Sequence, residues 1–253
     1  MAANCQLDNI RRACQLDCVR LTTDAVHGRI LVATRDIDVG EVVLAEKPLL
    51  VWQSDGRGPH DAIDFLDAYD AASEETRLAV ADFYCPDLDG QMGQVPLYRE
   101  LSRRLAEATQ LKLQHPLTAR DIHRLLMIKV TNAHSYTGTA GAYGEIVGGL
   151  GPHVKSAALF EMGSKVSHAC QPNTSYSSRH NNGMMTYTAI RPIRTGEMVT
   201  FSYIGDVLQT PTAARREDLR ARYGFECQCK HCTAGRRPRL ASGPRAAGAS
   251  GRR

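Results

Sequence analysis

The stretch Ser167-His168-Ala169-Cys170-Gln171-Pro172-Asn173 governs the interpretation of the whole chain. It places a histidine and a cysteine beside a Pro-Asn pair, which is typical of a polar turn. A cysteine displayed on such a turn suggests a metal ligand whose partners lie elsewhere. The plausible partners are far downstream, in Cys227-Gln228-Cys229-Lys230-His231-Cys232.

Cys227, Cys229 and Cys232 would supply three thiolates from a single short segment. A structural zinc ion takes four ligands, commonly four cysteines or three cysteines and a histidine. Cys170 is the strongest candidate for the fourth ligand, and His231 and His168 are its competitors. The alternative is that these cysteines are unliganded thiols, which their close spacing disfavours.

The composition is that of an ordinary globular protein. The 253 residues are 43% hydrophobic and 23% charged, enough for one large domain or one domain with an insertion. Eight cysteines occur without a secretory signal that we can recognise, which indicates a reducing compartment. No apolar run approaches the roughly 18 residues of a membrane span. We therefore expect a cytoplasmic or nuclear monomer without a membrane contact.

The basic character is concentrated in the segment 233–253, which holds six arginines and no acid. The remaining 25 basic and 27 acidic residues give the body a net charge of −2. This segment is rich in Gly, Ala, Ser and Pro, so we predict a disordered tail. Any nucleic-acid contact would be through this tail.

Hydrophobic patterning predicts a mostly β protein with a helical insertion. Short β-branched runs occupy 19–22, 30–34 and 41–45, and further strands are predicted at 185–190 and 197–203. Helical spacing is found in 61–84, 98–113 and 118–130, with Thr118 as an N-cap and a short charged helix at 211–222. The Gly-rich stretch 136–154 lacks the framing of a phosphate-binding loop and is predicted as a surface loop.

Four pieces of the chain resemble SET-domain protein lysine methyltransferases, most closely the SET-and-MYND (SMYD-like) branch. The segment 27–41 is similar to the N-terminal Gly-x-Gly strand and its Gly-Glu turn. The segment 167–173 resembles the Asn-His-Ser-Cys-x-Pro-Asn motif. The segments 196–203 and 223–232 resemble the Gly-Glu-Glu…Tyr motif and the post-SET aromatic and zinc module.

The resemblance implies a SET fold of small β-sheets with a pseudoknot, and roles for individual residues. S-adenosylmethionine would lie against one side of a narrow channel and a substrate lysine against the other. The implied catalytic residues are Tyr203 and Tyr223. The implied cofactor-binding residues are Gly28, Arg29, Ile30, Asn132, Ser167, His168, Tyr203 and Phe225. The implied zinc ligands are Cys170, Cys227, Cys229 and Cys232, in agreement with the spacing of the cysteines.

The same resemblance divides the chain into five parts. These are the N-terminal part of the SET domain (1–53), a helical insertion (54–131), the C-terminal part of the SET domain (132–208), a post-SET zinc segment (209–232) and the tail (233–253). The insertion lacks the Cys/His pairs of a MYND zinc module.

Two departures from the family pattern fall on the cofactor side. Ile30 stands where the family has its second glycine, which lets backbone approach a ligand closely. Ser167 stands where the family has an asparagine, whose amide both donates and accepts hydrogen bonds. The expected function is S-adenosylmethionine-dependent methylation of a lysine on a histone or non-histone protein. The alternative is a catalytically weakened SET-like module that binds protein.

The remaining cysteines have no assigned function. Cys5, Cys14 and Cys18 form a loose trio that is a minor candidate for a second metal site. Cys85 stands alone in the helical insertion and is expected to be an idle thiol.

Overall fold

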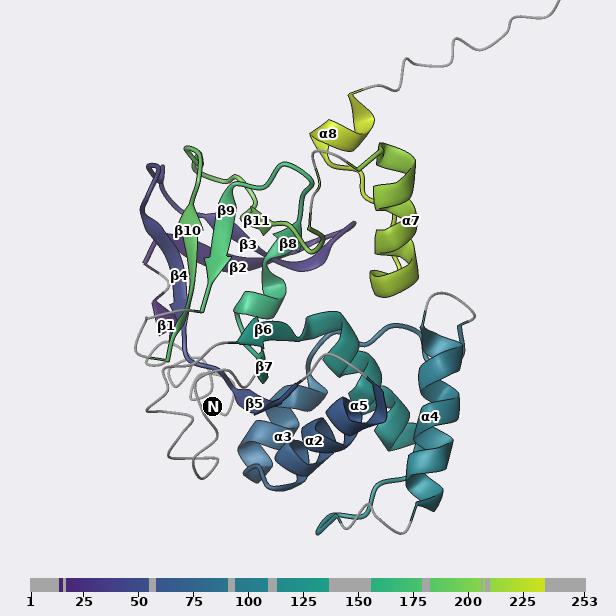
Figure 1. Ribbon diagram of the computed structural model, residues 1–253. Coiled ribbons are helices and arrows are strands. Elements are labelled where there is room, and N and C mark those ends of the chain that lie inside the picture. Colours follow the sequence, from purple (N-terminus) through teal and green to yellow (C-terminus); the bar gives the residue numbers. More distant parts are fainter. Residues whose placement is uncertain are drawn as a thin grey trace, which may run out of the picture.

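The computed structural model describes residues 14–15, 17–54, 58–90, 94–108, 113–136, 156–178, 183–205, 207 and 210–234. Strands make up one half of the molecule and helices the other, and a helical C-terminal unit lies beside the strands (Figure 1). This is the arrangement of small β-sheets with a helical insertion that the sequence predicts. No helix among the described residues is long and apolar enough to cross a membrane.

Within the part of the chain that the structure describes, the strands form four small sheets. The largest is antiparallel, in the order β1 (Cys14–Gln15), β4 (Val42–Glu46), β10 (Met185–Ala189) and β9 (Thr174–Ser177). A hairpin pairs β2 (Val19–Asp24) with β3 (Gly28–Ala33). The third sheet has the order β5 (Leu50–Gln53), β7 (Ser156–Leu159) and β6 (His134–Tyr136). The fourth pairs β8 (Ser167–His168) in parallel with β11 (Thr200–Phe201).

The turn between β2 and β3 shows how local sequence fixes a strand pair. The Asp24 carboxylate accepts hydrogen bonds from the backbone N–H groups of Val26 and His27. Gly28 then adopts a φ of 71°, a left-handed conformation that residues with a Cβ avoid. The hairpin register follows from this turn and buries the second half of β3.

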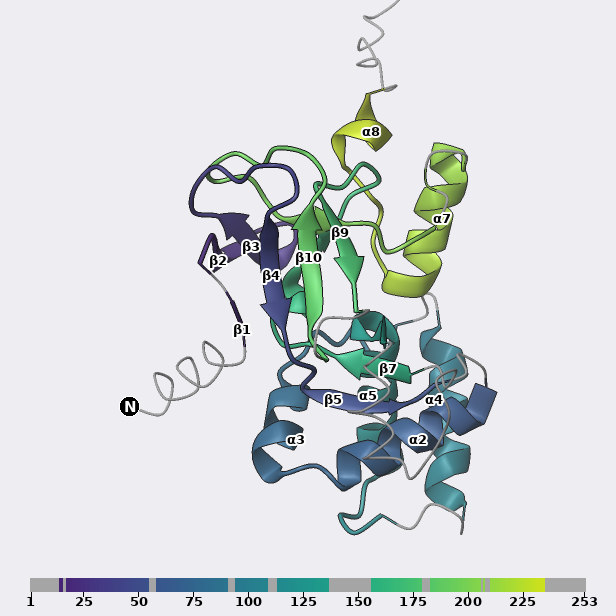
Figure 2. The same ribbon diagram turned by 60° about the vertical axis from the view of Figure 1, so that its left-hand side comes forward.

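The helices lie mainly in the predicted insertion. They are α2 (Gly58–Asp70), α3 (Glu74–Ala81), α4 (Val95–Glu107) and α5 (Ala119–Asn132), followed by the 3-10 turn η1 (Gly163–Lys165) and the C-terminal α7 (Thr212–Tyr223) and α8 (Lys230–Thr233). Figure 2 shows α2 and α3 grouped beneath β5. At the start of α5, the Thr118 hydroxyl accepts from the Asp121 N–H, and the Asp121 carboxylate accepts from the Thr118 N–H, which completes a capping box.

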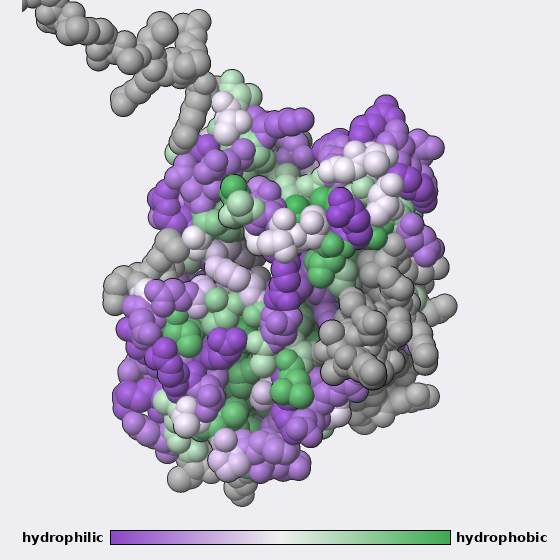
Figure 3. Space-filling view, turned by 180° about the vertical axis from the view of Figure 1, so that it is seen from behind, coloured by the Kyte–Doolittle hydropathy of each residue, from purple (hydrophilic) through white to green (hydrophobic). Residues whose placement is uncertain are grey.

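Three clusters of buried side chains hold these elements together. One fills the space between the sheets and includes Leu31, Leu44 and Tyr187. A second joins the helices to β5 and β7, and a third surrounds the C-terminal cysteines. Viewed from behind, apolar residues show through between the strand-rich upper half and the helical lower half, and hydrophilic residues dominate the periphery (Figure 3).

Two expectations for the strands need correction. The strand β5 was not predicted, because its Leu-Val-Trp run follows Pro48, where we ended the preceding strand. The predicted strand over 197–203 is paired only at Thr200–Phe201, apart from an isolated bridge between Val32 and Met198. Since the segment bridges β3 and then pairs with β8, it does not continue as one long strand.

Cys5 and nearly all of the tail and of the Gly-rich stretch lie outside the described residues, as does the side chain of Cys14. The N-terminal trio of cysteines is therefore untested. Cys18 is buried, and its thiol donates to the carbonyl of Val43. Cys85 is half-buried, and its thiol lies near backbone carbonyl oxygens, in keeping with an idle thiol.

Candidate active site and metal centre

The four cysteines predicted as zinc ligands converge in the folded chain. The sulfur atoms of Cys170, Cys227, Cys229 and Cys232 all lie within 4.8 Å of one another. The Cys170 sulfur is 3.9 Å from that of Cys227 and 3.5 Å from that of Cys232. A tetrahedral zinc ion with Zn–S bonds of about 2.3 Å sets sulfurs about 3.8 Å apart, so the spacing fits a four-thiolate site.

The chain returns to Cys170 through α7 and the turn after it. Gly224 ends α7 with a φ of 81°, the left-handed conformation that terminates many helices. The following segment brings Cys227 to the cluster, and Cys229 caps the short helix α8, which carries Cys232. Neither competing histidine belongs to this group of converging ligands among the described residues.

His168 instead connects the cysteine cluster to the next site. Its Nδ1 accepts a hydrogen bond from the Tyr203 N–H at 3.0 Å. Its Nε2 therefore carries the proton of the neutral ring and faces the Cys170 sulfur at 3.4 Å. Burial, with the nearby charge of Arg215, lowers the pKa of His168 to about 4. The ring is consequently neutral at physiological pH, and its tautomer is fixed.

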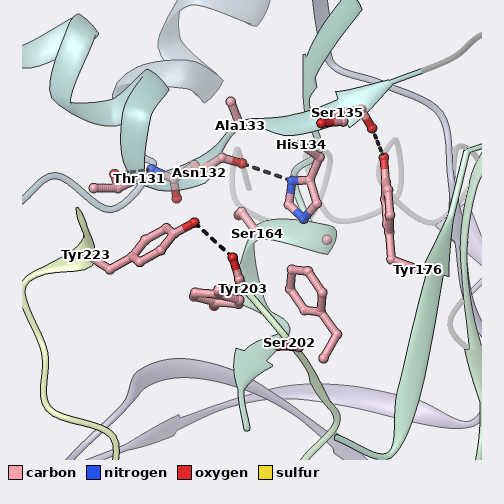
Figure 4. A pocket seen from close by; sticks show the side chains of 12 residues that line it. Thr131, Asn132, Ala133, His134, Ser135, Ser164, Tyr176, Ser202, Tyr203 and Tyr223 are labelled. Atoms are coloured by element: carbon pink, nitrogen blue, oxygen red, sulfur yellow. Dashed lines mark hydrogen bonds between the residues drawn. The ribbon is translucent and has the colours of Figure 1, made fainter. Parts of the chain in front are cut away.

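A cavity of about 270 Å³ opens beside this turn. Its walls come from the end of α5, from β6, from η1 and from the segment that follows β11 (Figure 4). The lining residues are Thr131, Asn132, Ala133, His134, Ser135, Gly163, Ser164, Tyr176, Phe201, Ser202, Tyr203 and Tyr223. No acidic side chain is among them, so the cavity is aromatic and uncharged where the structure describes it.

Tyr203 and Tyr223 form adjoining parts of the cavity wall (Figure 4). Their ring centroids are 5.1 Å apart, and the Tyr223 hydroxyl donates to the Tyr203 carbonyl at 3.4 Å. The Tyr203 hydroxyl donates to the Val166 carbonyl at 2.8 Å. Burial raises the pKa of both phenols above their usual range, so both stay protonated. Each oxygen keeps acceptor capacity toward the cavity.

Comparison with known families identifies this architecture. The sequence pattern of the SET domain matches residues 28–204, more than half of the chain. The chain belongs to the SET domain family. The resemblance found in the motifs of the sequence is thereby confirmed.

Individual relatives give the same result over different lengths of this SET chain. A SET domain-containing protein, L678 of Acanthamoeba polyphaga mimivirus, is 22% identical over 80% of this chain and 72% of its own length. The N-lysine methyltransferase SMYD2-B of Danio rerio is 40% identical over 30% of this chain, which is only 17% of the zebrafish protein. The SET domain of LSMT, solved with lysine and AdoHcy, superposes with a TM-score of 0.55 at 13% identity, covering 89% of this chain and 57% of the other.

The predicted cofactor residues of this SET domain fall into two groups. Asn132 lines the cavity, and the rings of His168 and Phe225 lie 5.3 and 6.3 Å from that of Tyr203. Ser167 is buried in β8, directly before His168. His168 and Phe225 thus lie next to Tyr203, and Asn132 shares the cavity wall with it.

Gly28, Arg29 and Ile30 form the second group and do not line the cavity. They open β3, which packs beside η1, and Arg29 forms an ion pair with Asp82 at the end of α3. Ile30 is buried and remains part of β3, so the strand accommodates its side chain.

The amide nitrogen of Asn132 is already engaged. It donates to the carbonyls of Ile128 and Tyr84, both at 2.8 Å. Its oxygen is thus the atom that can meet a ligand, and an amide oxygen accepts only. This suits a cationic donor such as an ammonium group.

Sequence reasoning missed His134, which lines the cavity. The Tyr187 hydroxyl lies 2.8 Å from its Nε2, and its Nδ1 lies 3.0 Å from the Asn132 carbonyl, so Nδ1 carries the proton and Nε2 accepts. Its ring stacks on Phe201 with centroids 5.5 Å apart. Burial lowers its pKa to about 4, so it remains uncharged. A lone histidine after a helix carries no motif by which it could have been found.

Proposed function

We propose that this chain is an S-adenosylmethionine-dependent protein-lysine N-methyltransferase. The observation that carries the proposal is the uncharged aromatic cavity bordered by Tyr203 and Tyr223 and placed beside the His168 turn. The substrate would be a lysine on a histone or non-histone protein. The division of the chain at residues 53, 131, 208 and 232 forms part of the same proposal.

The cavity suits the amine that must react. Methyl transfer needs a neutral lysine nitrogen, because an ammonium group has no lone pair. A buried aromatic site with no carboxylate among its described lining residues disfavours the ammonium form and lowers the pKa of a bound lysine. When bound, S-adenosylmethionine would supply the methyl group from its sulfonium and leave as S-adenosylhomocysteine, while the cavity would hold the lysine nitrogen neutral and let the proton released from the methylated amine pass to solvent.

Positioning would supply most of the rate. Holding amine and methyl group in line at near-attack distance replaces the entropy loss of a bimolecular encounter. The Tyr203 oxygen and neighbouring backbone carbonyls could accept weak C–H···O contacts from the polarised methyl group. We place the cofactor against His168 and Phe225, with the Asn132 oxygen toward its ammonium group and the lysine in the cavity.

We also propose that Cys170, Cys227, Cys229 and Cys232 hold zinc. A structural zinc would tie the C-terminal segment that carries Tyr223 and Phe225 to the His168 turn. Replacing Cys170 with serine should lower the zinc content to well below one equivalent, because a three-thiolate site binds more weakly. Elemental analysis after dialysis against a mild chelator measures this. A full equivalent of tightly held zinc in that variant would remove Cys170 from the ligand set.

Calorimetric titration with S-adenosylmethionine separates the enzyme from the alternative, a weakened SET module that binds protein. Ser167 and Ile30 favour that alternative, because each replaces a family residue on the cofactor side. Measurable binding at sub-millimolar cofactor concentration would support the proposal that the chain is an enzyme. The absence of such binding would contradict that proposal. Labelled cofactor incubated with a lysate would then reveal a methylated protein.

Given binding, Tyr203→Phe should reduce methyl transfer on the order of 100-fold, the scale of losing one preorganised polar group. Cofactor affinity should change little, since the ring and its contacts remain. Single-turnover kinetics with the substrate found in the lysate provides the measurement. An unchanged rate would show that the Tyr203 oxygen has no part in the reaction.

A further inference from the structure

Arg215 is a buried cation beside the cysteine cluster. It lies on α7, and only 2% of its surface is exposed. Its Nε lies 3.3 Å from the Cys170 sulfur, and its Nη2 lies 3.6 Å from the Cys232 sulfur. The guanidinium therefore donates toward two of the four sulfurs at once.

No carboxylate among the described residues pairs with Arg215, in contrast to the other arginines of α7. Arg216, Arg220 and Arg222 each have an acidic partner on α7 or in the segment after it. The remaining contacts of Arg215 are to neutral oxygens: the Val207 and Thr210 carbonyls and the Thr212 hydroxyl. A buried guanidinium without a nearby anion is strongly unfavourable.

The thiolates would supply the missing anion. Four thiolates around one divalent zinc carry a net charge of −2, which is also costly to bury without compensation. Arg215 is placed to offset that charge, because it is buried and its Nε and Nη2 face the sulfurs of Cys170 and Cys232.

We propose that Arg215 is the charge partner of the four-thiolate zinc site, a positioning residue that favours the metal-bound state of the cluster. This inference rests on the zinc part of the proposed function. It extends to the cavity, because the Cys170 sulfur faces both Arg215 and His168, and His168 in turn accepts from the Tyr203 N–H. The sulfur that Arg215 stabilises is the one that fixes the His168 ring.

Neutral replacements test the charge. Arg215→Met and Arg215→Gln should each weaken zinc retention by about 10- to 100-fold, the range seen when partners of metal ligands are removed. Arg215→Lys, which keeps the charge but not the forked donors, should fall in between. Retention is measured on the full-length protein loaded with one equivalent of zinc, by competition with a chromogenic chelator. Arg220→Met is the matched control, since Arg220 lies on the same helix and, within the described part of the chain, forms ion pairs with Glu217 and Glu226.

Thermal unfolding with and without zinc distinguishes this role from simple packing. A structural arginine would destabilise both forms equally when replaced. A charge partner of thiolates predicts that Arg215→Met lowers the melting temperature of the zinc-loaded protein but not that of the zinc-free, reduced protein. Arg215→Gln provides the same comparison if the methionine variant does not fold.

These experiments distinguish failure of the Arg215 proposal from failure of the proposed methyltransferase function. Wild-type zinc retention in both neutral variants, or equal destabilisation of the loaded and zinc-free forms, would overturn the role of Arg215 while leaving cofactor binding untouched. Absence of zinc from the wild-type protein would overturn the metal site itself. Absence of S-adenosylmethionine binding in zinc-loaded protein would overturn the enzyme alone.

Discussion

At the scale of single residues, Glu46 shows how a buried polar group holds the site. Its carboxylate, at the end of β4, accepts hydrogen bonds from the Met162 and Gly163 N–H groups at 2.8 to 3.1 Å. Those N–H groups belong to the turn η1 and the residue before it, and Gly163 lines the cavity. Burial raises the pKa of Glu46 to about 7, against the opposing effect of these two bonds.

The Glu46 pKa predicts a specific pH dependence of stability. Below pH 4.5 the carboxyl is protonated in both the folded and the unfolded chain. Between pH 4.5 and about 7 it ionises only in the unfolded chain, so stability falls as pH rises, by about 3 kcal/mol over that interval. Above pH 7 the loss is complete and constant.

Denaturant unfolding of wild type and Glu46→Gln at pH 5 and pH 8 isolates this effect. The side chain of the glutamine variant cannot ionise. The unfolding free energy of the wild type, relative to that of the variant, should therefore be lower at pH 8 than at pH 5. Other titrating groups cancel in that difference. A pH-independent difference would show that the carboxyl titrates at the same pH in folded and unfolded chains.

At the scale of elements, the short turn η1 is closely packed at Gly163. A Cβ on Gly163 would lie 2.6 Å from the end of the Met185 side chain and 2.9 Å from the Phe160 Cβ. The methionine could move, but Phe160 is fully buried. The position of η1, and hence one wall of the cavity, depends on this glycine.

Gly163→Ala should therefore destabilise the protein by about 1 to 3 kcal/mol, the usual consequence of overpacking. It should also weaken binding of S-adenosylmethionine, because η1 would be displaced. Gly205→Ala is the control, since nothing lies within 4 Å of a Cβ there and its φ is ordinary. Chemical denaturation and calorimetry on both variants give the answer, and equal stabilities would mean that η1 adjusts freely.

At the scale of the whole molecule, the predictable and unpredictable parts have different physical origins. The cysteines, His168, Tyr203 and Tyr223 were found because zinc chemistry and family motifs fix their spacing. The helix α5 was found because its capping box and apolar spacing are local. His134 and Glu46 were missed, and Arg215, which was expected on the exposed side of its helix, is buried. Each of the three contacts partners distant in sequence, a relation that spacing does not encode.

Removal of zinc should act on one region of the molecule. The C-terminal cluster is built around Cys170, Cys227 and Cys232, whereas the helical cluster contains none of the four. Chelation should therefore speed amide hydrogen exchange in α7 and in 225–234 by at least tenfold, with α5 little changed. Mass spectrometry of the exchanging protein resolves the two regions. Equal acceleration in α5 would mean that the molecule unfolds as one unit.

Cys170 contacts cysteines that lie 57 to 62 residues later in the chain, which determines when the cluster can form during protein synthesis. A ribosome adds about 5 to 20 residues per second, so roughly 3 to 12 seconds separate the synthesis of Cys170 from that of Cys232. During that interval Cys170 has been made and its three partners have not all followed. A nascent chain that ends between Tyr203 and Arg215 contains His168, Cys170 and Tyr203 but lacks the Arg215 cation and three of the four sulfurs. The cysteine cluster beside the cavity can be completed only after Tyr203 and Tyr223 have both been synthesised.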